Sequence, residues 1–450
     1  MKTENPAVYI VSLGCAKNLV DTEVMCGTLA VDGYLLTDDL EQADIVLINT
    51  CSFIADARDE AEAEIMAALE WKKQKQGRYI AVAGCLPQRD IDSVRQRYSD
   101  VDLFLGLDDV PEVGRRLREI HNTAEARCGD IAIGEAEYVY DHKTPRLQLT
   151  PENYAYIKIA EGCNHFCRFC AIPAIRGRLR SRSNASIKAE LQNLVSQGVK
   201  EINLIAQDTT AYGTDRSDNA SLTGLLRSLN DVEGEFWVRI LYTHPRYFTE
   251  EVLEAMAGDS RILPYIDMPL QHISDKILQA MGRQTSGGEV RKMLALMRHK
   301  LPEAVLRTTF LVGYPGETET DYRELLDFVK QTRFDRLGVF AFSPEQGTAA
   351  AGITEDIVPS EVAEARRAEI LTVQQDIALA KNQKLVGSKL RILVETADDS
   401  GYGVGRTAAD APEVDNHVHF SFDRGDPVKD GFVNVEINHA EPYDLYGYII

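Results

Sequence analysis

Three cysteines stand close together in the middle of the chain, at Cys163, Cys167 and Cys170, separated by three and then two residues. Thiolates at such spacing can bind one face of an iron–sulfur cluster. Three ligands leave one iron of a cubane without a protein thiolate, and an open metal position is where chemistry occurs. The alternatives are a zinc site with His165 as fourth ligand, or three structural thiols. The spacing favours the cluster, because structural zinc usually takes four ligands in two pairs.

Three more cysteines each follow a short apolar run that is typical of a buried strand. The runs and their cysteines are Val8–Val11 with Cys15, Ile45–Ile48 with Cys51, and Tyr79–Val82 with Cys85. Helical patterns over about 19–31 and 56–76 separate the runs, so a parallel sheet is predicted. The carboxyl ends of parallel strands lie along one edge, where ligands bind. We therefore expect these three cysteines to meet in one crevice.

A second series of strands and helices must position the central cysteines. The predicted strands are Tyr154–Ile159, Glu201–Ile205, Trp237–Leu241, Tyr265–Met268, Arg307–Val312 and Arg336–Phe342, and the clearest helices are Ala185–Gln197, Thr249–Ala257 and Glu319–Gln331. Six such units indicate an incomplete barrel, whose chemistry sits at the carboxyl ends of its strands. Cys163 directly follows the first of these strands.

The last part of the chain has a different pattern. A helix is predicted over Ser360–Leu385, followed by short alternating strands at Leu390–Val394, His417–Phe422 and Phe432–Ile437. The glycine-rich stretch Gly401–Gly405 has no helix after it, so we interpret it as a hairpin and not as a dinucleotide-binding loop.

These patterns predict an α/β fold with three domains. A parallel α/β domain over residues 1–125 holds the second cysteine triad, a partial six-unit β/α barrel covers 149–379, and a small all-β domain covers 382–450. The polar segment from Cys128 to Thr150 is predicted to be a linker.

Composition and charge restrict the class of protein. The chain has 450 residues, with 49 Lys and Arg against 70 Asp and Glu, a net charge of −21. Such a chain repels phosphate backbones as a whole, which argues against direct nucleic-acid readout and for a basic or neutral partner. No apolar run is long enough to cross a membrane, and no signal sequence is recognised, so a cytoplasmic protein is expected.

The central motif resembles a known family. Cys163, Cys167 and Cys170, with Phe169 before the last cysteine, are similar to the signature of radical S-adenosylmethionine enzymes, which also have a partial barrel. The resemblance implies that these three cysteines hold a [4Fe–4S] cluster whose free iron binds S-adenosylmethionine. Reductive cleavage of that molecule then gives a 5′-deoxyadenosyl radical.

The resemblance extends to the amino-terminal cysteines. The segments around Cys15, Cys51 and Cys85 are similar to motifs of the methylthiotransferases, and the carboxyl-terminal module resembles the substrate-binding TRAM domain. The resemblance implies that these three cysteines hold a second [4Fe–4S] cluster, so that the cofactors are two clusters and S-adenosylmethionine. One molecule of S-adenosylmethionine would donate a methyl group, and another would give the radical that removes hydrogen from the substrate.

Methylthiotransferases divide by substrate. The MiaB type modifies an adenosine in transfer RNA, and the RimO type modifies the β-carbon of an aspartate in small-subunit ribosomal protein twelve. Residues 385–450 contain five Lys or Arg and twelve Asp or Glu, a net charge of −7. An acidic module suits a basic ribosomal protein better than RNA. The segments Ser12–Asp21, Gln207–Gly213 and Ala408–Asp415 also resemble the RimO type, although Ala16 stands where relatives often have Pro.

The resulting hypothesis is a protein aspartate (3)-methylthiotransferase that needs an electron donor and a sulfur source as partners. The transfer-RNA enzyme is the first alternative, and a non-catalytic iron–sulfur carrier is the second. No acid–base pair is predicted, because the substrate C–H bond has no acidic proton.

Further expectations concern arginines, strand-end segments, cysteines and histidines. The arginines after the cysteine loop could form a solvated face, offset the charge of thiolates and sulfides, or bind RNA; they are Arg168, Arg176, Arg178, Arg180 and Arg182. The segments Gln207–Asp208 and Gly313–Thr318 are expected at strand ends, the second as a tight turn or as part of the S-adenosylmethionine pocket. Cys26 is expected in the core, Cys128 receives no role, and His417 and His419 are not predicted to bind metal.

Overall fold

The computed structural model describes residues 5–122, 133–423 and 431–450. The chain divides into two compact units. The first comprises residues 1–149 with two later pieces, 158–166 and 170–187, and the second comprises 150–157, 167–169 and 188–450. The central cysteine loop therefore contributes residues to both units, and Cys128 lies outside the described residues.

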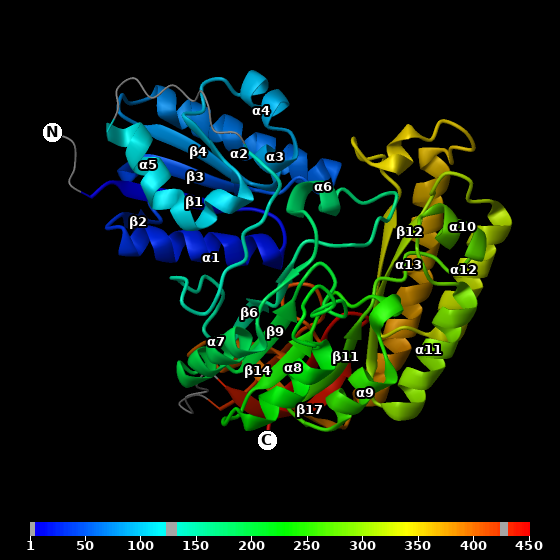
Figure 1. Cartoon of the computed structure of the whole chain (residues 1–450). Coiled ribbons are helices and arrows are strands. Elements are labelled where there is room, and N and C mark those ends of the chain that lie inside the picture. The colour runs from blue at the N-terminus through cyan, green and yellow to red at the C-terminus, as the bar shows by residue number, and fades with distance from the viewer. Residues whose placement is uncertain (1–4, 123–132, 424–430) are drawn as a thin grey trace. The chain divides into compact units, whose positions relative to one another are not determined.

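The first unit is built on a five-stranded parallel sheet with strand order β2-β1-β3-β4-β5 (Figure 1). Its strands are β1 (Ala7–Ser12), β2 (Leu35–Thr37), β3 (Ile45–Thr50), β4 (Tyr79–Gly84) and β5 (Leu103–Leu105). All six residues of β3 are buried, because a central parallel strand is covered on both faces. The short edge strands β2 and β5 were not anticipated, since three residues carry too little pattern.

Helices cover this sheet. They are α1 (Ala16–Val31), α2 (Ala55–Lys73), α3 (Cys85–Arg89), α4 (Ile91–Arg97) and α5 (Val113–Asn122), with 3-10 turns η1 (Leu40–Gln42) and η2 (Leu107–Glu112). Ile65 and Trp71 of α2 pack with Ile48, Val82 and Phe104 of the strands in one core cluster. The first unit also contains β7 (Ala160–Glu161), α6 (Ile172–Arg176) and β8 (Arg180–Ser181).

The second unit contains a six-stranded sheet with order β13-β12-β11-β10-β9-β6. Its strands are β6 (Tyr154–Lys158), β9 (Glu201–Ile205), β10 (Trp237–Ile240), β11 (Ile262–Asp267), β12 (Val305–Val312) and β13 (Arg336–Ala341). Each strand overlaps the one predicted from the sequence. The order follows the chain from β9 to β13, and the pairs from β9 onward are parallel, as expected for an open β/α barrel.

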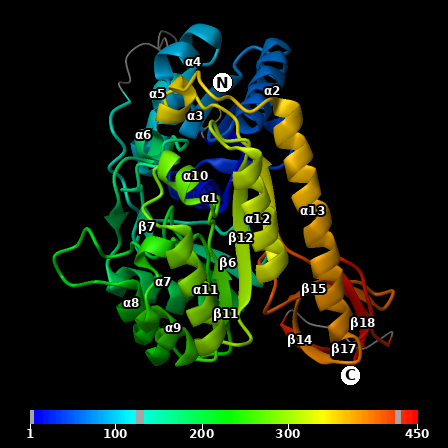
Figure 2. The same ribbon diagram turned by 90° about the vertical axis from the view of Figure 1, so that its right-hand side faces the viewer.

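The helices of this unit are α7 (Asn184–Ser196), α8 (Leu222–Ser228), α9 (Glu250–Ala257), α10 (Asp275–Ala280), α11 (Gly287–Lys300), α12 (Glu319–Thr332) and α13 (Ser360–Asn382), with η3 (Leu229–Asp231), η4 (Pro245–Tyr247), η5 (Ala349–Gly352) and η6 (Gln383–Leu385). They lie between these strands in the chain, except for η5, α13 and η6, which follow β13. A capping box fixes the start of α12. The Thr318 hydroxyl accepts a hydrogen bond from the Asp321 N–H, and the Asp321 carboxylate accepts one from the Thr318 N–H. Figure 2 shows α13 running beside α12 to the carboxyl-terminal strands.

The chain ends in a closed five-stranded barrel of order β14-β15-β16-β18-β17. Its strands are β14 (Lys389–Ala397), β15 (Tyr402–Thr407), β16 (Val418–Ser421), β17 (Phe432–Ala440) and β18 (Leu445–Ile449). The interpretation of Gly401–Gly405 as part of a hairpin is confirmed: Gly401 ends the turn after β14, and residues 402–405 begin β15, which pairs antiparallel with β14. A Cβ at Gly403 would lie 2.4 Å from the Phe420 ring, and one at Gly405 would lie 2.3 Å from the Leu393 carbonyl oxygen. The glycines therefore permit close strand packing.

The segment between β15 and β16, residues 408–417, inserts against the amino-terminal ends of the barrel strands. Asp410 pairs with Arg336, the first residue of β13. Asp415 pairs with Arg307 of β12 at 3.4 Å and accepts a hydrogen bond from the Tyr265 hydroxyl of β11 at 2.5 Å. Two ion pairs and a hydrogen bond thus attach the carboxyl-terminal module to the strands of the β/α barrel.

A second ionic contact joins the same two parts. Glu201, the first residue of β9, accepts from Arg239 of β10 at 2.7 Å and pairs with Arg406 of β15 at 2.7 Å. All three side chains are fully buried. Glu395 binds the same Arg406. Glu395, Asp410 and Asp415 are among the twelve acids of residues 385–450, and the prediction that these acids attract a basic substrate is wrong for these three, because arginines of this chain bind them.

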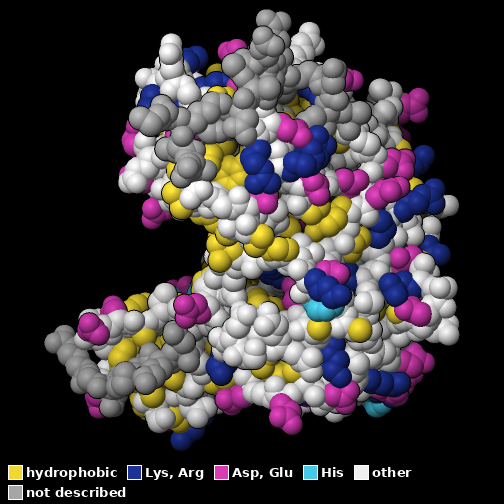
Figure 3. Space-filling model, turned by 60° about the vertical axis from the view of Figure 1, so that its left-hand side comes forward, with side chains coloured by type: hydrophobic (Ala, Val, Ile, Leu, Met, Phe, Trp, Pro, Cys, Tyr) yellow, Lys and Arg dark blue, Asp and Glu magenta, His cyan; other side chains and the backbone are white. Residues whose placement is uncertain are grey.

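The predicted fold class is confirmed: a parallel α/β sheet domain, a six-stranded β/α barrel and a small β-barrel. In the part of the chain that the structure describes, no helix is long and apolar enough to cross a membrane. Acidic side chains are interspersed with Lys and Arg on the face drawn in Figure 3 and do not gather in one patch.

Candidate active site

The three amino-terminal cysteines lie at the carboxyl ends of three neighbouring strands. Cys51 directly follows β3 and Cys85 directly follows β4, while Cys15 comes three residues after β1. Because β1, β3 and β4 are adjacent in the sheet, their carboxyl ends bring these residues to one edge. This placement at one edge agrees with the expectation from strand order, and the role of the three cysteines as ligands of one cluster stays a prediction.

Close backbone packing holds this group together. Gly14 has φ +90°, and a Cβ there would lie 2.5 Å from the Cβ and 3.0 Å from the Sγ of Cys51. The Ser52 hydroxyl donates to the carbonyl of Cys85 at 2.9 Å, and the Thr50 hydroxyl donates to the carbonyl of Ala83 at 2.7 Å. These bonds tie the loop after β3 to the loop after β4.

The three thiols differ in their electrostatic surroundings. Burial opposes ionisation of Cys15, but the charges of Lys17 and Arg176 and the backbone N–H groups at the start of α1 lower its pKa. Burial raises the pKa of Cys85 to about 12, and the neighbouring Cys51 and Cys15 add to that rise. Burial also raises the pKa of Cys51. A positive metal centre would favour the thiolate form of Cys51 and Cys85, whose ionisation burial and the neighbouring cysteines oppose.

Arg176 contacts this group from α6, the helix that follows the central cysteine loop. Its Nη2 lies 3.4 Å from the Sγ of Cys85 and 3.2 Å from the Oδ1 of Asn18. Asn18 in turn donates to the carbonyl of Leu13 at 2.6 Å. The guanidinium is 2% exposed, so this contact is made out of water.

A buried group of four charged residues surrounds the same arginine. Arg176 pairs with Asp21 of α1 at 2.9 Å and with Glu161 of β7 at 3.1 Å. Lys158 contacts both carboxylates as well. Burial alone would raise the pKa of Glu161, but Lys158 and Arg176 lower it to about 2. The carboxylate is therefore ionised and holds the guanidinium in place.

The first part of the central cysteine loop is held by backbone bonds. The Cys163 N–H donates to the carbonyl of Gly177 at 3.1 Å, and the His165 N–H points to the Cys163 sulfur at 3.4 Å. Gly162 has φ +73°, and a Cβ there would lie 2.0 Å from the carbonyl oxygen of Arg178. The glycine is required for the loop to pass so close to this backbone.

The middle of the loop belongs to the second unit. Arg168 donates its N–H to the carbonyl of Met281 at 2.9 Å and accepts from the Ala350 N–H at 2.8 Å. The Arg283 guanidinium lies 3.8 Å from the sulfur of Cys167 and donates to the carbonyl of Pro269 at 2.6 Å. Cys167 therefore also has an arginine donor from a distant part of the sequence.

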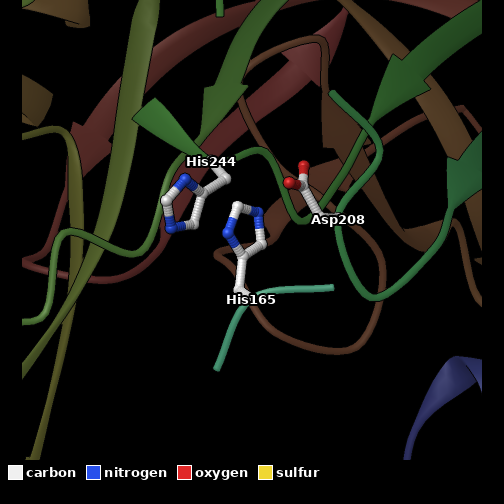
Figure 4. A group of neighbouring side chains, drawn as sticks. All are labelled: His165, Asp208 and His244. Carbon is white, nitrogen blue, oxygen red and sulfur yellow. The ribbon is translucent and has the colours of Figure 1, made fainter. Parts of the chain in front are cut away.

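Polar residues end the next two barrel strands. Asp208 follows β9 and His244 follows β10, and both are labelled in Figure 4. The Thr210 hydroxyl binds the Asp208 carboxylate, and it accepts from the His244 N–H at 3.1 Å. The predicted segment Gln207–Asp208 thus lies at the carboxyl edge of the sheet, where barrel enzymes bind substrate.

The segment Gly313–Thr318 forms a tight turn after β12. Gly313 has φ +77°, and its N–H donates to the buried carboxylate of Glu317. Arg366 binds the same carboxylate at 2.9 Å. Burial raises the pKa of Glu317 although Arg366 opposes the rise. The turn is internally bonded, and its contact with S-adenosylmethionine stays a prediction.

The arginines after the cysteine loop do not form one solvated face. Arg176 and Arg182 are buried, and Arg182 lies 4.1 Å from the Tyr140 ring, while Arg178 is exposed. Cys26 is 2% exposed in the core, as expected.

Sequence reasoning missed the contact of Arg283 with Cys167 and the buried charges around Arg176. A signal was present in Lys158 and Glu161, two ionisable residues that directly precede the cysteine loop.

The donor set suits a cluster. Three thiols from adjacent strand ends are the kind of ligand that binds an iron–sulfur cluster, and arginine donors suit a group with negatively charged sulfurs.

Comparison with known proteins agrees with this geometry. The Radical SAM superfamily matches residues 157–329, the TRAM domain matches 386–450, and a family described only as uncharacterized protein family UPF0004 matches 7–106. Among solved structures, the radical S-adenosylmethionine methyltransferase TsrM from Kitasatospora setae has a TM-score of 0.57 at 15% identity, covering 87% of this chain and 79% of its own. At that identity the likeness shows the fold alone. The fold and the superfamily match define a radical S-adenosylmethionine enzyme.

Sequence relatives give the particular family. "Ribosomal protein uS12 methylthiotransferase RimO" of Heliobacterium modesticaldum is 42% identical, over 98% of this chain and 94% of the relative. The proteins of the same name from Thermotoga maritima and Desulfitobacterium hafniense are 42% and 39% identical, covering 98% and 100% of this chain and 100% of each relative. The chain belongs to this family of radical S-adenosylmethionine methylthiotransferases. The predicted cofactors, two [4Fe–4S] clusters and S-adenosylmethionine, are those of the family.

Proposed function

We propose that this protein transfers a methylthio group to the β-carbon of an aspartate in ribosomal protein uS12. One S-adenosylmethionine serves as methyl donor, and a second gives the radical that removes hydrogen. The observation that carries the proposal is the presence of two cysteine triads in a chain that is 42% identical to a uS12 methylthiotransferase over nearly its whole length.

The proposal assigns Cys163, Cys167 and Cys170 as ligands of the cluster that binds S-adenosylmethionine. Cys15, Cys51 and Cys85 are the ligands of the second cluster. When bound, the clusters would pass on an electron and carry the sulfur that the external partners provide, and S-adenosylmethionine would supply the methyl group and the radical.

The residues of this chain orient these groups and exclude water. Arg283 donates toward Cys167, and Arg176 donates toward Cys85, so each triad has a fixed cation beside one thiolate. Asp208 and His244 lie at the carboxyl edge of the barrel, where barrel enzymes bind substrate, and Thr210 bonds both of them. An electron donor and a sulfur source complete the reaction as external partners.

The first experiment offers two substrates in parallel. The protein is reconstituted with iron and sulfide without oxygen and supplied with S-adenosylmethionine, sulfide and a strong reductant. Ribosomal protein uS12 and unmodified transfer RNA are then analysed by mass spectrometry. A methylthio mass gain on an aspartate-containing peptide is expected. A gain on adenosine instead would overturn the assigned substrate while keeping the chemistry.

Variants separate the two triads. Cys163→Ala should abolish cleavage of S-adenosylmethionine, whereas Cys51→Ala should stop methylthio transfer and leave some reductive cleavage. Methylthiolation at the wild-type rate by Cys51→Ala would contradict the assignment of the second cluster. Absence of any S-adenosylmethionine cleavage by the wild type would favour a non-catalytic iron–sulfur carrier.

A further inference from the structure

We propose that Arg176 is a positioning residue of the second cluster: its guanidinium bonds the Cys85 thiolate and sets how readily that cluster is reduced. This inference rests on the proposed assignment of Cys15, Cys51 and Cys85 as cluster ligands. It adds a residue outside the cysteine motifs, on the helix that follows the S-adenosylmethionine loop.

The first argument is the geometry of one nitrogen. Nη2 of Arg176 lies 3.4 Å from the sulfur of Cys85 and 3.2 Å from Oδ1 of Asn18. An N–H···S bond of this length stabilises charge on the sulfur, and such bonds are one of the ways in which a protein tunes a cluster. The arginine is 2% exposed, so water does not compete for the bond.

The second argument is that the other nitrogen is fully used to hold the guanidinium in place. Nη1 binds Asp21 and Glu161, at 2.9 and 3.1 Å. Lys158 pairs with both of these carboxylates. The planar guanidinium presents its N–H donors in a rigid fork, whereas a lysine presents a compact charge on a flexible stem. Nη2 is therefore aimed at Cys85 by a rigid support.

The third argument is charge. Two cations and two carboxylates make the buried group of Lys158, Arg176, Asp21 and Glu161 neutral as a whole. An arginine side chain keeps its charge in proteins, and the carboxylates of Asp21 and Glu161 beside it stabilise that charge. Because the four-residue group has no net charge, the effect of Arg176 on Cys85 depends on how close its guanidinium lies to the sulfur and on the direction of its N–H bond.

A cluster that gains an electron becomes more negative. A nearby N–H donor and positive charge stabilise the reduced state, and a nearby carboxylate destabilises it. Removing Arg176 should therefore make the second cluster harder to reduce, whereas neutralising Glu161 should make it easier. If Arg176 and Glu161 merely supported the fold, replacing them would not change the ease of cluster reduction in opposite directions.

The test isolates the second cluster. The parent variant carries Cys163→Ala, Cys167→Ala and Cys170→Ala, so that only the amino-terminal triad can hold iron. After reconstitution, iron and sulfide content, the electron paramagnetic resonance spectrum of the reduced protein and the midpoint of a redox titration are measured. A parent that holds no cluster would contradict the proposed second cluster itself, and with it this inference.

In this parent, Arg176→Met keeps similar length but removes the donor and the charge. At a fixed potential, we expect the ratio of reduced to oxidised cluster to fall about tenfold, which is about 59 mV for a one-electron couple. Arg176→Lys, which keeps the charge, should restore part of the loss. The matched control is Arg178→Met, because Arg178 is exposed and lies two residues away; it should leave the midpoint unchanged.

The partner variant Glu161→Gln should shift the midpoint in the opposite direction. Should Arg176→Met fail to fold, the double variant Arg176→Met/Glu161→Gln keeps the buried group neutral and removes only the bond to sulfur. Its cluster should still be harder to reduce than that of the parent. A loaded cluster whose midpoint and spectrum match the parent in the Arg176→Met or the double variant would overturn the inference and leave the proposed function intact.

Discussion

At the scale of the residue, Gly14 is a position where backbone conformation and packing both exclude a side chain. Its φ of +90° favours glycine, and a Cβ would lie 2.5 Å from that of Cys51. Gly14→Ala is therefore expected to displace Cys51 and to lower the iron content of the reconstituted protein from two clusters toward one. Iron and sulfide analysis measures this loss.

Gly77 supplies a matched control for Gly14. Its φ is +86°, but nothing lies within 4 Å of a Cβ placed there. Gly77→Ala carries the same kind of backbone strain without the collision, so its iron content should equal that of the wild type. Equal iron content in both variants would show that the contact of Gly14 with Cys51 has no role in cluster binding.

His272 gives a prediction about pH. It is fully buried, and its Nδ1 accepts from the Ser274 N–H at 3.0 Å. Burial lowers its pKa from 6.5 to about 4, although Asp321 opposes the shift. Between these values the unfolded state binds more protons than the folded state, so stability falls as the pH drops from about 6.5 to 4. The full loss is about 3 kcal/mol, at 1.36 kcal/mol per pKa unit.

The check compares the wild type with His272→Gln, which does not titrate in this range. Urea unfolding is followed at pH 7.5, 6 and 5. The advantage of the wild type over the variant should shrink as the pH falls, because the other titrating groups are common to both proteins. Parallel pH profiles for the two proteins would contradict the prediction.

At the scale of the element, the segment between β15 and β16 connects the carboxyl-terminal module to the barrel. Asp410 binds Arg336, and both side chains are largely removed from water. Breaking one partner of a buried ion pair leaves the other charge uncompensated, at a cost of about 3 kcal/mol. Asp410→Asn should therefore lower the free energy of unfolding by about this amount, as measured by urea unfolding.

Asp399 provides the comparison for Asp410. It is exposed in the same module, so Asp399→Asn should change stability by less than about 0.5 kcal/mol. The double variant Asp410→Asn/Arg336→Met removes both charges and should be less harmful than the sum of its single changes. A strictly additive result would show that the two residues do not stabilise one another.

Elements with strong periodicity were predictable from the sequence, and elements that depend on distant partners were not. The strand Glu201–Ile205 was predicted with its observed bounds, because a short apolar run with one charged end is typical of a buried parallel strand. A hairpin was predicted at Gly401–Gly405, but the extent of strand β15 was not, because its glycines are explained by the Phe420 ring and by the β14 backbone. Those neighbours are not visible in the local sequence.

The candidate site was also predictable only in part. The meeting of Cys15, Cys51 and Cys85 followed from the rule that parallel strands end along one edge. The contact between Arg176 and Cys85 did not follow from this rule, because the two residues are 91 positions apart and no local pattern relates them. Sequence pattern places groups at an edge, and side-chain packing decides which of them touch.

At the scale of the whole molecule, the net charge of −21 is an incomplete guide to the substrate. Two acids of the carboxyl-terminal module, Asp410 and Asp415, bind the barrel arginines Arg336 and Arg307 and do not face a partner. Other acids of the module are exposed, among them Asp399, Asp423 and Glu441. Only these exposed charges can attract a basic protein over a distance, and salt screens them with a Debye length of about 10 Å at 0.1 M.

Neutralising these three exposed acids by Asp399→Asn, Asp423→Asn and Glu441→Gln should raise the KM for ribosomal protein uS12 several-fold at low salt. The wild-type KM should rise with salt toward that of the triple variant, because screening removes the same attraction. Cleavage of S-adenosylmethionine without substrate should be unchanged, since none of the three residues belongs to a cysteine triad. Initial rates of methylthiolation at two salt concentrations measure the effect.

The control carries the same change of charge elsewhere, at the exposed Asp59, Glu60 and Asp92 of the first unit. If attraction depends on the carboxyl-terminal module, this variant should keep the wild-type KM and salt dependence. Equal effects of both triple variants would mean that total charge alone governs the encounter. No effect of either would mean that recognition of the basic substrate depends on short-range contacts, and the charge argument for the substrate would then fail.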